Sequence, residues 1–184
     1  MRVVFLLITL VVFSFSKGLK DENILFGMPH DFKVGYKAYN PKSSLSFAEF
    51  VPKTESVKDW SQMLTVSIYH KNLPISANEY IANMKEMWQK ECKQSYTKVI
   101  SEGKENGYDY ALIMLYCPKS KISHKEEYTW IKAIKGNDSF YAIQKAFAMK
   151  PDEAQITGTM RYLRQVQLCD TRLKNCPKGI LGVK

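Results

Sequence analysis

The chain has 184 residues, of which 27 are basic and 18 acidic, with a net charge of +9. This length suits one domain with a single hydrophobic core. No internal repeat or low-complexity tract occurs, and no apolar segment after the N-terminal residues is long enough to span a bilayer, which excludes repeat arrays and multi-span membrane proteins. A basic balance favours anionic surfaces, but the lysines are scattered, as on a solvated face, so we expect no nucleic-acid partner.

The first 16 residues predict a signal peptide. A single charge at Arg2 precedes an apolar run over residues 3–13 and the small residues Ser14 and Ser16. A membrane anchor needs roughly 20 apolar residues, and this run has about half of that. No cysteine follows to carry a bacterial lipid anchor. We therefore expect cleavage after residue 16 and one exported domain over residues 17–184, periplasmic or extracellular, with a net charge lowered to +8 by the loss of Arg2.

Four cysteines, an even number, predict two disulfides in an oxidising compartment. Three pairings are possible. Cys169 and Cys176 are separated by a polar spacer that can turn back, so we pair them locally and pair Cys92 with Cys117. Zinc is the competing reading, but no pair of CxxC knuckles is present. His30, His70 and His124 also lie far from the cysteines in sequence, so we expect no metal and no cofactor.

Two strands joined by a turn begin the predicted fold. Residues 17–29 mix charged and apolar residues and predict an irregular lead-in. Residues 32–39 and 45–51 alternate with a period of two, as strands do, and the polar turn over residues 40–43 contains a proline. These two segments predict a hairpin.

The next segment combines polar residues, an aromatic anchor and the clearest strand pattern. Thr54–Asp59 predicts a short helical turn, with Trp60 folded back on the core. Residues 63–69 alternate, which places one set of side chains on the core: Leu64, Val66 and Ile68. Glu55 and Asp59 could act as an acid pair, and Trp60 as a stacking platform. Solvated acids and a structural tryptophan are the competing interpretation, which we favour.

The most secure helix begins at Ser76, where Glu79 completes a capping box. Its apolar stripe predicts packing on a sheet and contains Tyr80, Ile81, Met84, Met87, Trp88 and Cys92. Residues 97–102 and 108–117 then predict a hairpin with an Asn-Gly turn. Because the second of these strands is almost entirely apolar, we expect it to be central and covered on both faces.

A basic loop over residues 118–127 precedes the last elements. Residues 128–135 and 139–149 predict another hairpin, and residues 151–166 a second amphipathic helix with Pro151 in its first position. From Cys169 onward we expect a basic tail that hangs from the local disulfide.

No catalytic motif is present. The chain lacks a Gly-x-Ser-x-Gly elbow and a phosphate-binding glycine loop, and its three histidines read as surface residues. An active site could still assemble from distant positions, so the motifs alone leave enzymatic activity open, with the absence of activity favoured.

Two resemblances bear on fold and role. The order of three strands, a long helix, four strands and a final helix, with a tryptophan near the third strand, resembles the PsbP/Mog1-like α-β-α arrangement, whose members include small exported proteins. The segment Glu55-Ser-x-x-Asp-Trp-Ser-x-Met-x-Thr65 resembles small uncharacterised exported proteins of Gram-negative bacteria, some released by type II secretion. This second resemblance implies a noncatalytic periplasmic or released factor.

We therefore predict an α+β protein with a mostly antiparallel sheet of six to seven strands and two packed helices. It would be a disulfide-stabilised, noncatalytic binding or accessory protein and a monomer. The expected binding surfaces are an exposed sheet face, the Trp60 region and the basic loop, with a protein or an anionic surface as partner. The alternative is a secreted hydrolase or toxin-like effector using Glu55, Asp59 and a histidine. A third reading is anion binding through Arg161, Arg164, Arg172 and Lys174.

Overall fold

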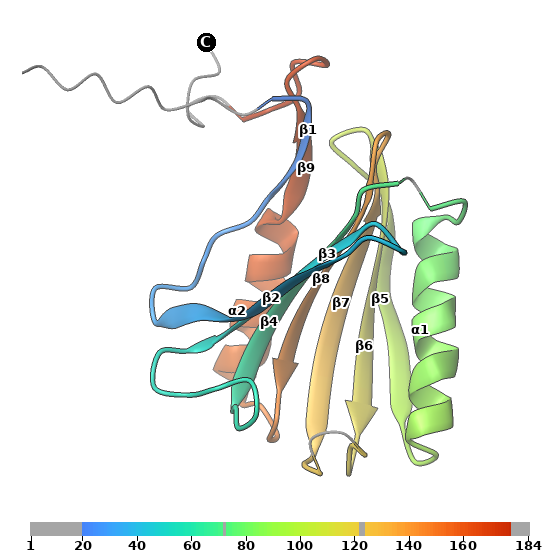
Figure 1. The fold of residues 1–184 in the computed structure, drawn as a ribbon. Coiled ribbons are helices and arrows are strands. Elements are labelled where there is room, and N and C mark those ends of the chain that lie inside the picture. Colours follow the sequence, from blue (N-terminus) through green and yellow to red (C-terminus); the bar gives the residue numbers. More distant parts are fainter. Residues whose placement is uncertain (1–19, 72, 122–123, 178–184) are drawn as a thin grey trace, which may run out of the picture.

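A seven-stranded antiparallel sheet forms the centre of the molecule, with the strand order β2-β3-β4-β8-β7-β6-β5. The computed structural model describes residues 20–71, 73–121 and 124–177. The α+β class and the seven-stranded sheet predicted from the sequence are confirmed (Figure 1). The strands of this sheet are β2 (Phe32–Asn40), β3 (Leu45–Pro52), β4 (Gln62–Tyr69), β5 (Tyr96–Glu105), β6 (Tyr108–Cys117), β7 (Glu127–Lys135) and β8 (Phe140–Phe147).

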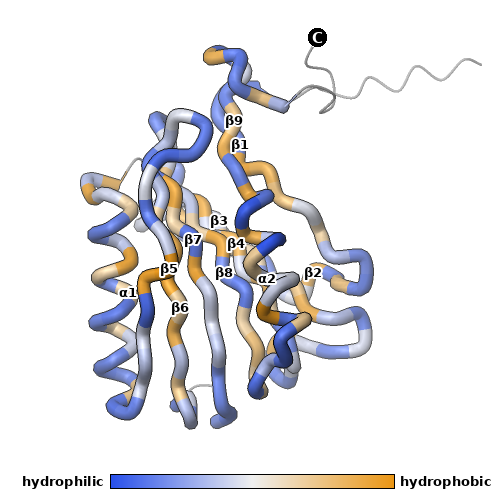
Figure 2. Tube along the Cα trace, turned by 180° about the vertical axis from the view of Figure 1, so that it is seen from behind, coloured by the Kyte–Doolittle hydropathy of each residue, from blue (hydrophilic) through white to orange (hydrophobic). Residues whose placement is uncertain are grey.

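Two helices pack against opposite faces of the sheet, α1 (Ala77–Glu91) and α2 (Glu153–Gln165). The predicted capping box of Ser76 and Glu79 starts α1, and a second box of Asp152 and Gln155 starts α2. Pro151 therefore precedes the N-cap of α2 and is not its first helical residue. In Figure 2 hydrophobic and hydrophilic residues alternate along both helices, as expected for amphipathic helices with one face on the sheet.

β4 and β8 occupy the middle of the sheet, and both of their faces are covered. Leu64 and Val66 are buried in the core under α2, as their alternation predicts. Met63 and Thr65, on the other face of β4, are buried as well. The apolar β6 lies between β5 and β7, so it is an interior strand, while the central position belongs to β8.

The two ends of the described chain form a separate two-stranded antiparallel ribbon of β1 (Glu22–Leu25) and β9 (Gln167–Asp170). The irregular lead-in and the hanging tail expected from the sequence are therefore wrong in these segments. Four-residue strands have too few residues to show a period. Their partner also lies at the other end of the chain, so no local pattern could reveal the pairing.

Polar side chains fasten this ribbon to two turns of the large sheet. The Asn106 side-chain amide donates to Leu168 O at 2.6 Å and to Asn175 O at 2.8 Å. The Glu22 carboxylate accepts hydrogen bonds from the backbone N–H of Asn137 at 2.6 Å and of Ser139 at 3.3 Å. Both hairpin turns at this end of the sheet are thus tied to the ribbon, an arrangement we call the clasp.

The structure pairs the cysteines as the spacing predicts, Cys92 with Cys117 and Cys169 with Cys176. The first disulfide joins the C-cap of α1 to the last residue of β6. The second closes a short loop that starts near the end of β9, at Cys169. The predicted signal peptide and the last seven residues lie outside the described residues.

A candidate binding cavity beside Trp60

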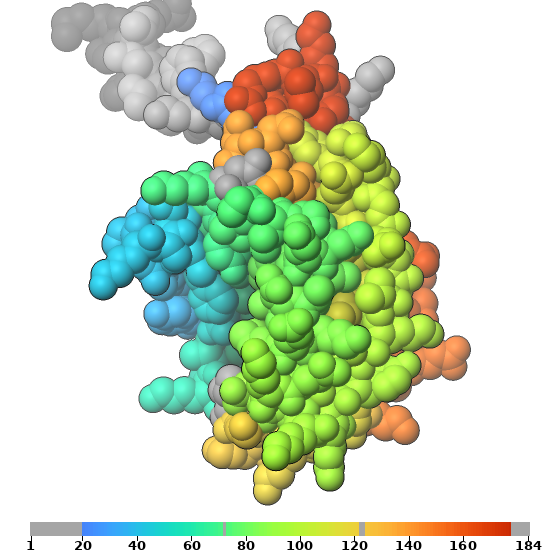
Figure 3. Space-filling view, turned by 90° about the vertical axis from the view of Figure 1, so that its right-hand side faces the viewer, coloured from blue at the N-terminus to red at the C-terminus, as the bar shows by residue number. Residues whose placement is uncertain are grey.

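A cavity of about 540 Å³ lies on the face of the sheet that α1 covers. α1 packs mainly on β6 and β7, and its Tyr80 also contacts Phe140 on β8. The cavity lies over β3 and the parts of β4 and β8 that α1 does not cover. In Figure 3, which looks onto this side of the molecule, α1 runs down the middle, with residues of the N-terminal third on one side and β5 on the other. The Trp60 segment and the basic loop after β6 close the cavity instead; we call it the Trp60 cavity.

Apolar side chains from four separate parts of the chain form its walls. Trp60 and Val57 come from the segment before β4, and pack against a small core of Val51, Met63 and Ala146. Met87 and Trp88 come from the last turns of α1, and the Cys92–Cys117 disulfide lines the end beside them. Met87 is 50% exposed because it faces the cavity and solvent, not the sheet. The apolar stripe predicted for α1 therefore packs on the sheet with some of its residues and lines the cavity with others.

The floor of the cavity carries a row of three polar side chains in direct cross-strand register. Glu49 on β3 lies opposite Thr65 on β4, which in turn lies opposite Gln144 on β8. All three residues line the cavity. Burial raises the pKa of the Glu49 carboxyl, because removal from water disfavours its charged form. The floor can therefore offer hydrogen-bond donors and acceptors to a ligand.

A second acid, Glu127, reaches the same cavity from the start of β7. It is 9% exposed, and its carboxylate accepts a hydrogen bond from Thr129 Oγ1 at 3.2 Å. Burial raises the pKa of Glu127, and hydrogen bonds from Thr129 and Ser120 partly oppose that shift. An acid with a raised pKa is a potential hydrogen-bond donor inside a largely apolar cavity.

Lysines surround the mouth of the cavity, and the described contacts of two of them are ion pairs. Lys125 Nζ lies 2.6 Å from Asp59 Oδ1, and Lys121 Nζ lies 3.4 Å from Glu91 Oε2. The hydrogen bond and the positive charge of Lys125 lower the pKa of Asp59. The basic loop predicted as a binding surface thus contacts the segment that carries Trp60.

The segment that carries the predicted acid pair, Glu55 and Asp59, has a different local structure from the one predicted. Thr54–Asp59 is not a helical turn: Ser56 and Asp59 exchange backbone hydrogen bonds across a tight turn. The Glu55 carboxylate accepts hydrogen bonds from Ser61 N at 2.7 Å and Ser61 Oγ at 2.6 Å. Asp59 points to Lys125, with its side chain 84% exposed. Neither acid is among the residues that line the cavity.

The arginines predicted to bind anions do not line the Trp60 cavity. Arg161 and Arg164 are exposed on α2. Arg172 follows β9, where its guanidinium Nη2 lies 2.5 Å from both Asp170 Oδ2 and Asp138 Oδ2. Hydrogen bonds to these two carboxylates raise the pKa of Arg172. Its charge is thus already matched by two acids, and it serves the clasp. Lys174 lies in the turn that follows β9.

The histidines do not gather at the cavity. His70 Nε2 lies 2.7 Å from Ser46 Oγ, at the far end of β4, and its ring contacts Tyr39. His30 precedes β2, and His124 lies in the loop before β7. Within the described ranges, no three His, Cys, Asp or Glu side chains group together as a metal site would require. No helix of the described part is both long and apolar enough to cross a bilayer.

Sequence reasoning named Trp60 and the basic loop but missed Glu49, Gln144 and Glu127. A signal for Glu49 was present, since it occupies the same strand face as Phe47 and Val51, and an acid on an apolar face is unusual. Gln144 interrupts the apolar β8 in the same way. Glu127 had no such signal, because its neighbours in sequence are the charged residues of the loop.

Comparison with known proteins places the fold but not the activity. No protein-family model matches the chain, and no curated protein sequence matches it. The solved structure of the cyanobacterial PsbP protein, CyanoP, from Synechocystis sp. PCC 6803 is similar with a TM-score of 0.52 and 9% identity, over 84% of this chain and 96% of that chain. LpqN of Mycobacterium tuberculosis, described as involved in cell envelope biogenesis, has a TM-score of 0.41 and 8% identity, over 84% and 87% of the two chains. The chain therefore has a PsbP-like fold, as the order of its elements predicts.

Proposed function

We propose that this protein is an exported, disulfide-stabilised binding or accessory protein whose site is the Trp60 cavity. Its ligand would be an apolar molecule with a hydrogen-bonding group, such as a hydroxyl or a carbonyl. The observation that carries the proposal is the combination of a cavity of about 540 Å³ with a polar row on its floor, Glu49, Thr65 and Gln144. Release to the periplasm or by type II secretion remains part of the proposal.

Size and lining both support a small-molecule site. Ligand cavities in proteins have volumes of roughly 300–1,000 Å³, mostly apolar linings and a few well-placed polar groups. The two indoles of Trp60 and Trp88 give broad flat surfaces, and Met63 and Met87 adapt to irregular shapes. An apolar ligand would bury its body against these side chains and place its polar group on the floor.

Export is supported by the two disulfides, since such bonds persist in oxidising compartments. The signal peptide predicted for the N-terminal residues would direct this export. A PsbP-like fold occurs in proteins with different roles, so the fold by itself assigns no ligand.

The hydrolase reading has less support. It requires Glu55, Asp59 and a histidine around one deep pocket, and the described residues that line the Trp60 cavity include none of the three. Glu55 is engaged by Ser61, and Asp59 by Lys125. These contacts suit residues that hold the Trp60 segment against the sheet.

Titration with the amphiphiles 1-decanol, decanoate and decylamine and with decane, followed by tryptophan fluorescence, tests the proposal. We expect decanol to bind, and Trp60→Ala to weaken its binding about tenfold, which corresponds to about 1.4 kcal/mol. Thr65→Val, which removes the hydroxyl from the floor and keeps the side-chain shape, should weaken decanol more than decane.

Tyr96→Ala is the matched control, because Tyr96 is an exposed aromatic residue on β5 that does not line the cavity. This variant should bind decanol like the unchanged protein. Failure of all three amphiphiles to bind, or equal binding to the Trp60→Ala variant, would contradict the proposed site.

A further inference from the structure

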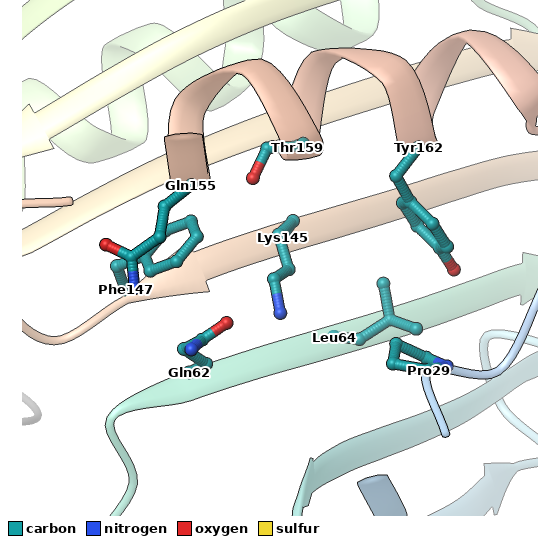
Figure 4. A pocket seen from close by; sticks show the side chains of 9 residues that line it. Pro29, Gln62, Leu64, Lys145, Phe147, Gln155, Thr159 and Tyr162 are labelled. Carbon is teal, nitrogen blue, oxygen red and sulfur yellow. The ribbon is translucent and has the colours of Figure 1, made fainter. Parts of the chain in front are cut away.

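A second, smaller pocket lies on the opposite face of the sheet, under α2. Its volume is about 230 Å³ (Figure 4). β8 contributes to both sites, because successive side chains of a strand point to opposite faces. Gln144 and Ala146 line the Trp60 cavity, whereas Lys145 and Phe147 line this second pocket. We call it the Lys145 pocket.

Lys145 is the unusual residue of this pocket. It is 9% exposed, and its ammonium group lies over the Phe32 ring, 4.2 Å from the centroid, and 5.3 Å from the centroid of Phe147. No hydrogen bond or ion pair with a described residue reaches its Nζ, although Asp31 exerts a weak attraction. Aromatic faces stabilise a cation only in part, so the ammonium group of this largely buried side chain lacks a close counter-charge.

A second polar group in the same pocket lacks a partner. The Tyr162 hydroxyl is buried, and no described residue is within hydrogen-bonding distance. Burial raises the pKa of Tyr162, so the phenol keeps its proton and remains a donor. Both residues line the pocket, and Figure 4 shows Tyr162 extending from α2 and Lys145 from β8 toward β4, with Leu64 between their ends in this view. A buried donor without an acceptor is unfavourable, and a ligand oxygen could supply the missing acceptor.

The remaining lining selects the ligand. It contains no carboxylate, and its apolar members include Pro29, Leu64 and Phe147. A cationic ligand would meet only the like charge of Lys145. An anion would neutralise that charge and accept a hydrogen bond from the Tyr162 hydroxyl, and the apolar walls would contact a hydrocarbon tail. A cavity of about 150 Å³ already accommodates benzene, so this pocket suits a molecule of similar or slightly larger size.

Gly158 lies at the exposed rim of the pocket. It lies on α2 between Gln155 and Tyr162, on the helix face that lines the pocket, and an added Cβ would meet no atom within 4 Å. Glycine inside a helix is destabilising relative to alanine. A residue that weakens α2 but is not required by packing has a natural explanation if a side chain there would fill a binding site.

We propose that the Lys145 pocket binds a small organic monocarboxylate with a short apolar tail, whose carboxylate pairs with Lys145 and accepts a hydrogen bond from the Tyr162 hydroxyl. This site is independent of the Trp60 cavity and would remain if the function proposed for that cavity were wrong.

The test uses the full mature chain and titration with butyrate, butyramide, butylamine and inorganic phosphate, followed by calorimetry and by amide chemical shifts in NMR spectra. We expect butyrate to bind and to shift the amides of Gln62, Lys145 and Tyr162. Butyramide should bind at least tenfold more weakly, and butylamine should not bind. Phosphate binding as tightly as butyrate would contradict a carboxylate site with an apolar tail.

Variants distinguish binding in the Lys145 pocket from nonspecific attraction to positive surface charge. Lys145→Met should abolish butyrate binding, Tyr162→Phe should weaken it severalfold, and Gly158→Leu should block the pocket while Lys145 stays in place. Lys150→Met, which removes an exposed lysine near the end of β8, should bind as before. If Lys145→Met does not fold, Gly158→Leu and the chemical shifts of the unchanged protein still decide. Unchanged binding in Gly158→Leu, or no butyrate binding at all, would overturn the proposal.

Discussion

At the scale of the residue, two buried lysines on the same face of the sheet have different surroundings. Lys132 is 1% exposed, forms an ion pair with Glu105 and donates to the carbonyl oxygens of Leu163 at 3.0 Å and Val166 at 2.8 Å. It thereby satisfies carbonyl groups at the C-terminal end of α2, where a positive charge is favourable. Lys145 has no such partners, which is why we interpret Lys132 as structural and Lys145 as a binding group.

The stability of the protein should depend on the titration of Lys145. Burial lowers its pKa to about 8, below the ordinary value of 10.5. Between these values the unfolded chain binds more protons than the folded one, so the free energy of unfolding rises with pH. From pH 8 to pH 10 this gain should be about 2 kcal/mol. Urea unfolding at several pH values should show the gain in the unchanged protein and not in Lys145→Met.

Lys145→Met should also be more stable than the unchanged protein at pH 7, because an apolar side chain of similar length replaces a buried charge. Lys150→Met controls for the loss of one positive charge. If both variants follow the pH dependence of the unchanged protein, Lys145 is not the titrating group.

Glu127 should show an effect of the opposite sign. Burial raises the pKa of its carboxyl, so the folded state binds more protons than the unfolded state just above the ordinary pKa of 4.5. Stability is therefore lost as the pH rises through this window. Glu127→Gln keeps the shape without the charge and should raise the melting temperature by a few degrees at pH 7. Near pH 4 the difference should vanish.

Thermal unfolding at the two pH values measures this effect, with the exposed Glu86→Gln on α1 as the matched control. A Glu127→Gln variant that is less stable at pH 7 would mean that the hydrogen bonds from Thr129 and Ser120 outweigh the cost of burial.

At the scale of the element, the Cys92–Cys117 disulfide connects the end of α1 to β6 beside the Trp60 cavity. The bond closes a loop with a sequence separation of 25 residues, for which the chain-entropy model gives about 3.5 kcal/mol. Replacing both cysteines with alanine should therefore lower the free energy of unfolding by about 3 kcal/mol. The same variant should weaken decanol binding, because the last turn of α1 carries Met87 and Trp88.

Chemical denaturation and decanol titration of the two double variants provide the comparison. Replacement of Cys169 and Cys176 should cost about 2.5 kcal/mol, since the loop is shorter, and should leave decanol binding unchanged. Equal effects of both pairs on binding would argue against a specific role of the first bond at the cavity.

At the scale of the whole molecule, the clasp joins segments from both ends of the described chain to the turns of two hairpins, β5–β6 and β7–β8. Asn106 is a turn residue with a positive φ of 51°, and its side chain spans from the β5–β6 turn to β9 and Asn175. Asn106→Gly keeps this backbone conformation accessible and removes the side-chain bonds, with an expected loss of about 1–3 kcal/mol.

Hydrogen exchange can locate that loss. Amides of β1 and β9 should exchange faster in Asn106→Gly. Amides of β4 and β8 should lose protection only by the amount that corresponds to the change in global stability. Faster exchange throughout the sheet to the same degree would mean that the ribbon and the sheet unfold as one unit.

The sequence by itself determined the local elements of this protein: seven strands of the sheet, two helices and three hairpins. Alternation, capping residues and turn residues act over a few neighbouring positions, so their physics is readable along the chain. The spacing of the cysteines also predicted both disulfides. The helical turn predicted for Thr54–Asp59 was wrong. The hydrogen bond between Glu55 and Ser61 and the backbone pair of Ser56 and Asp59 favour a tight turn instead.

Only the tertiary structure decided where these elements create cavities. α1 covers part of its sheet face, and that position depends on packing and on the Cys92–Cys117 bond between distant residues. The same packing brings Trp60, Thr65 and Gln144 to one cavity, and leaves Lys145 between two aromatic rings under α2. Burial and unmatched polar groups are properties of the folded chain, because each depends on neighbours that are far apart in sequence.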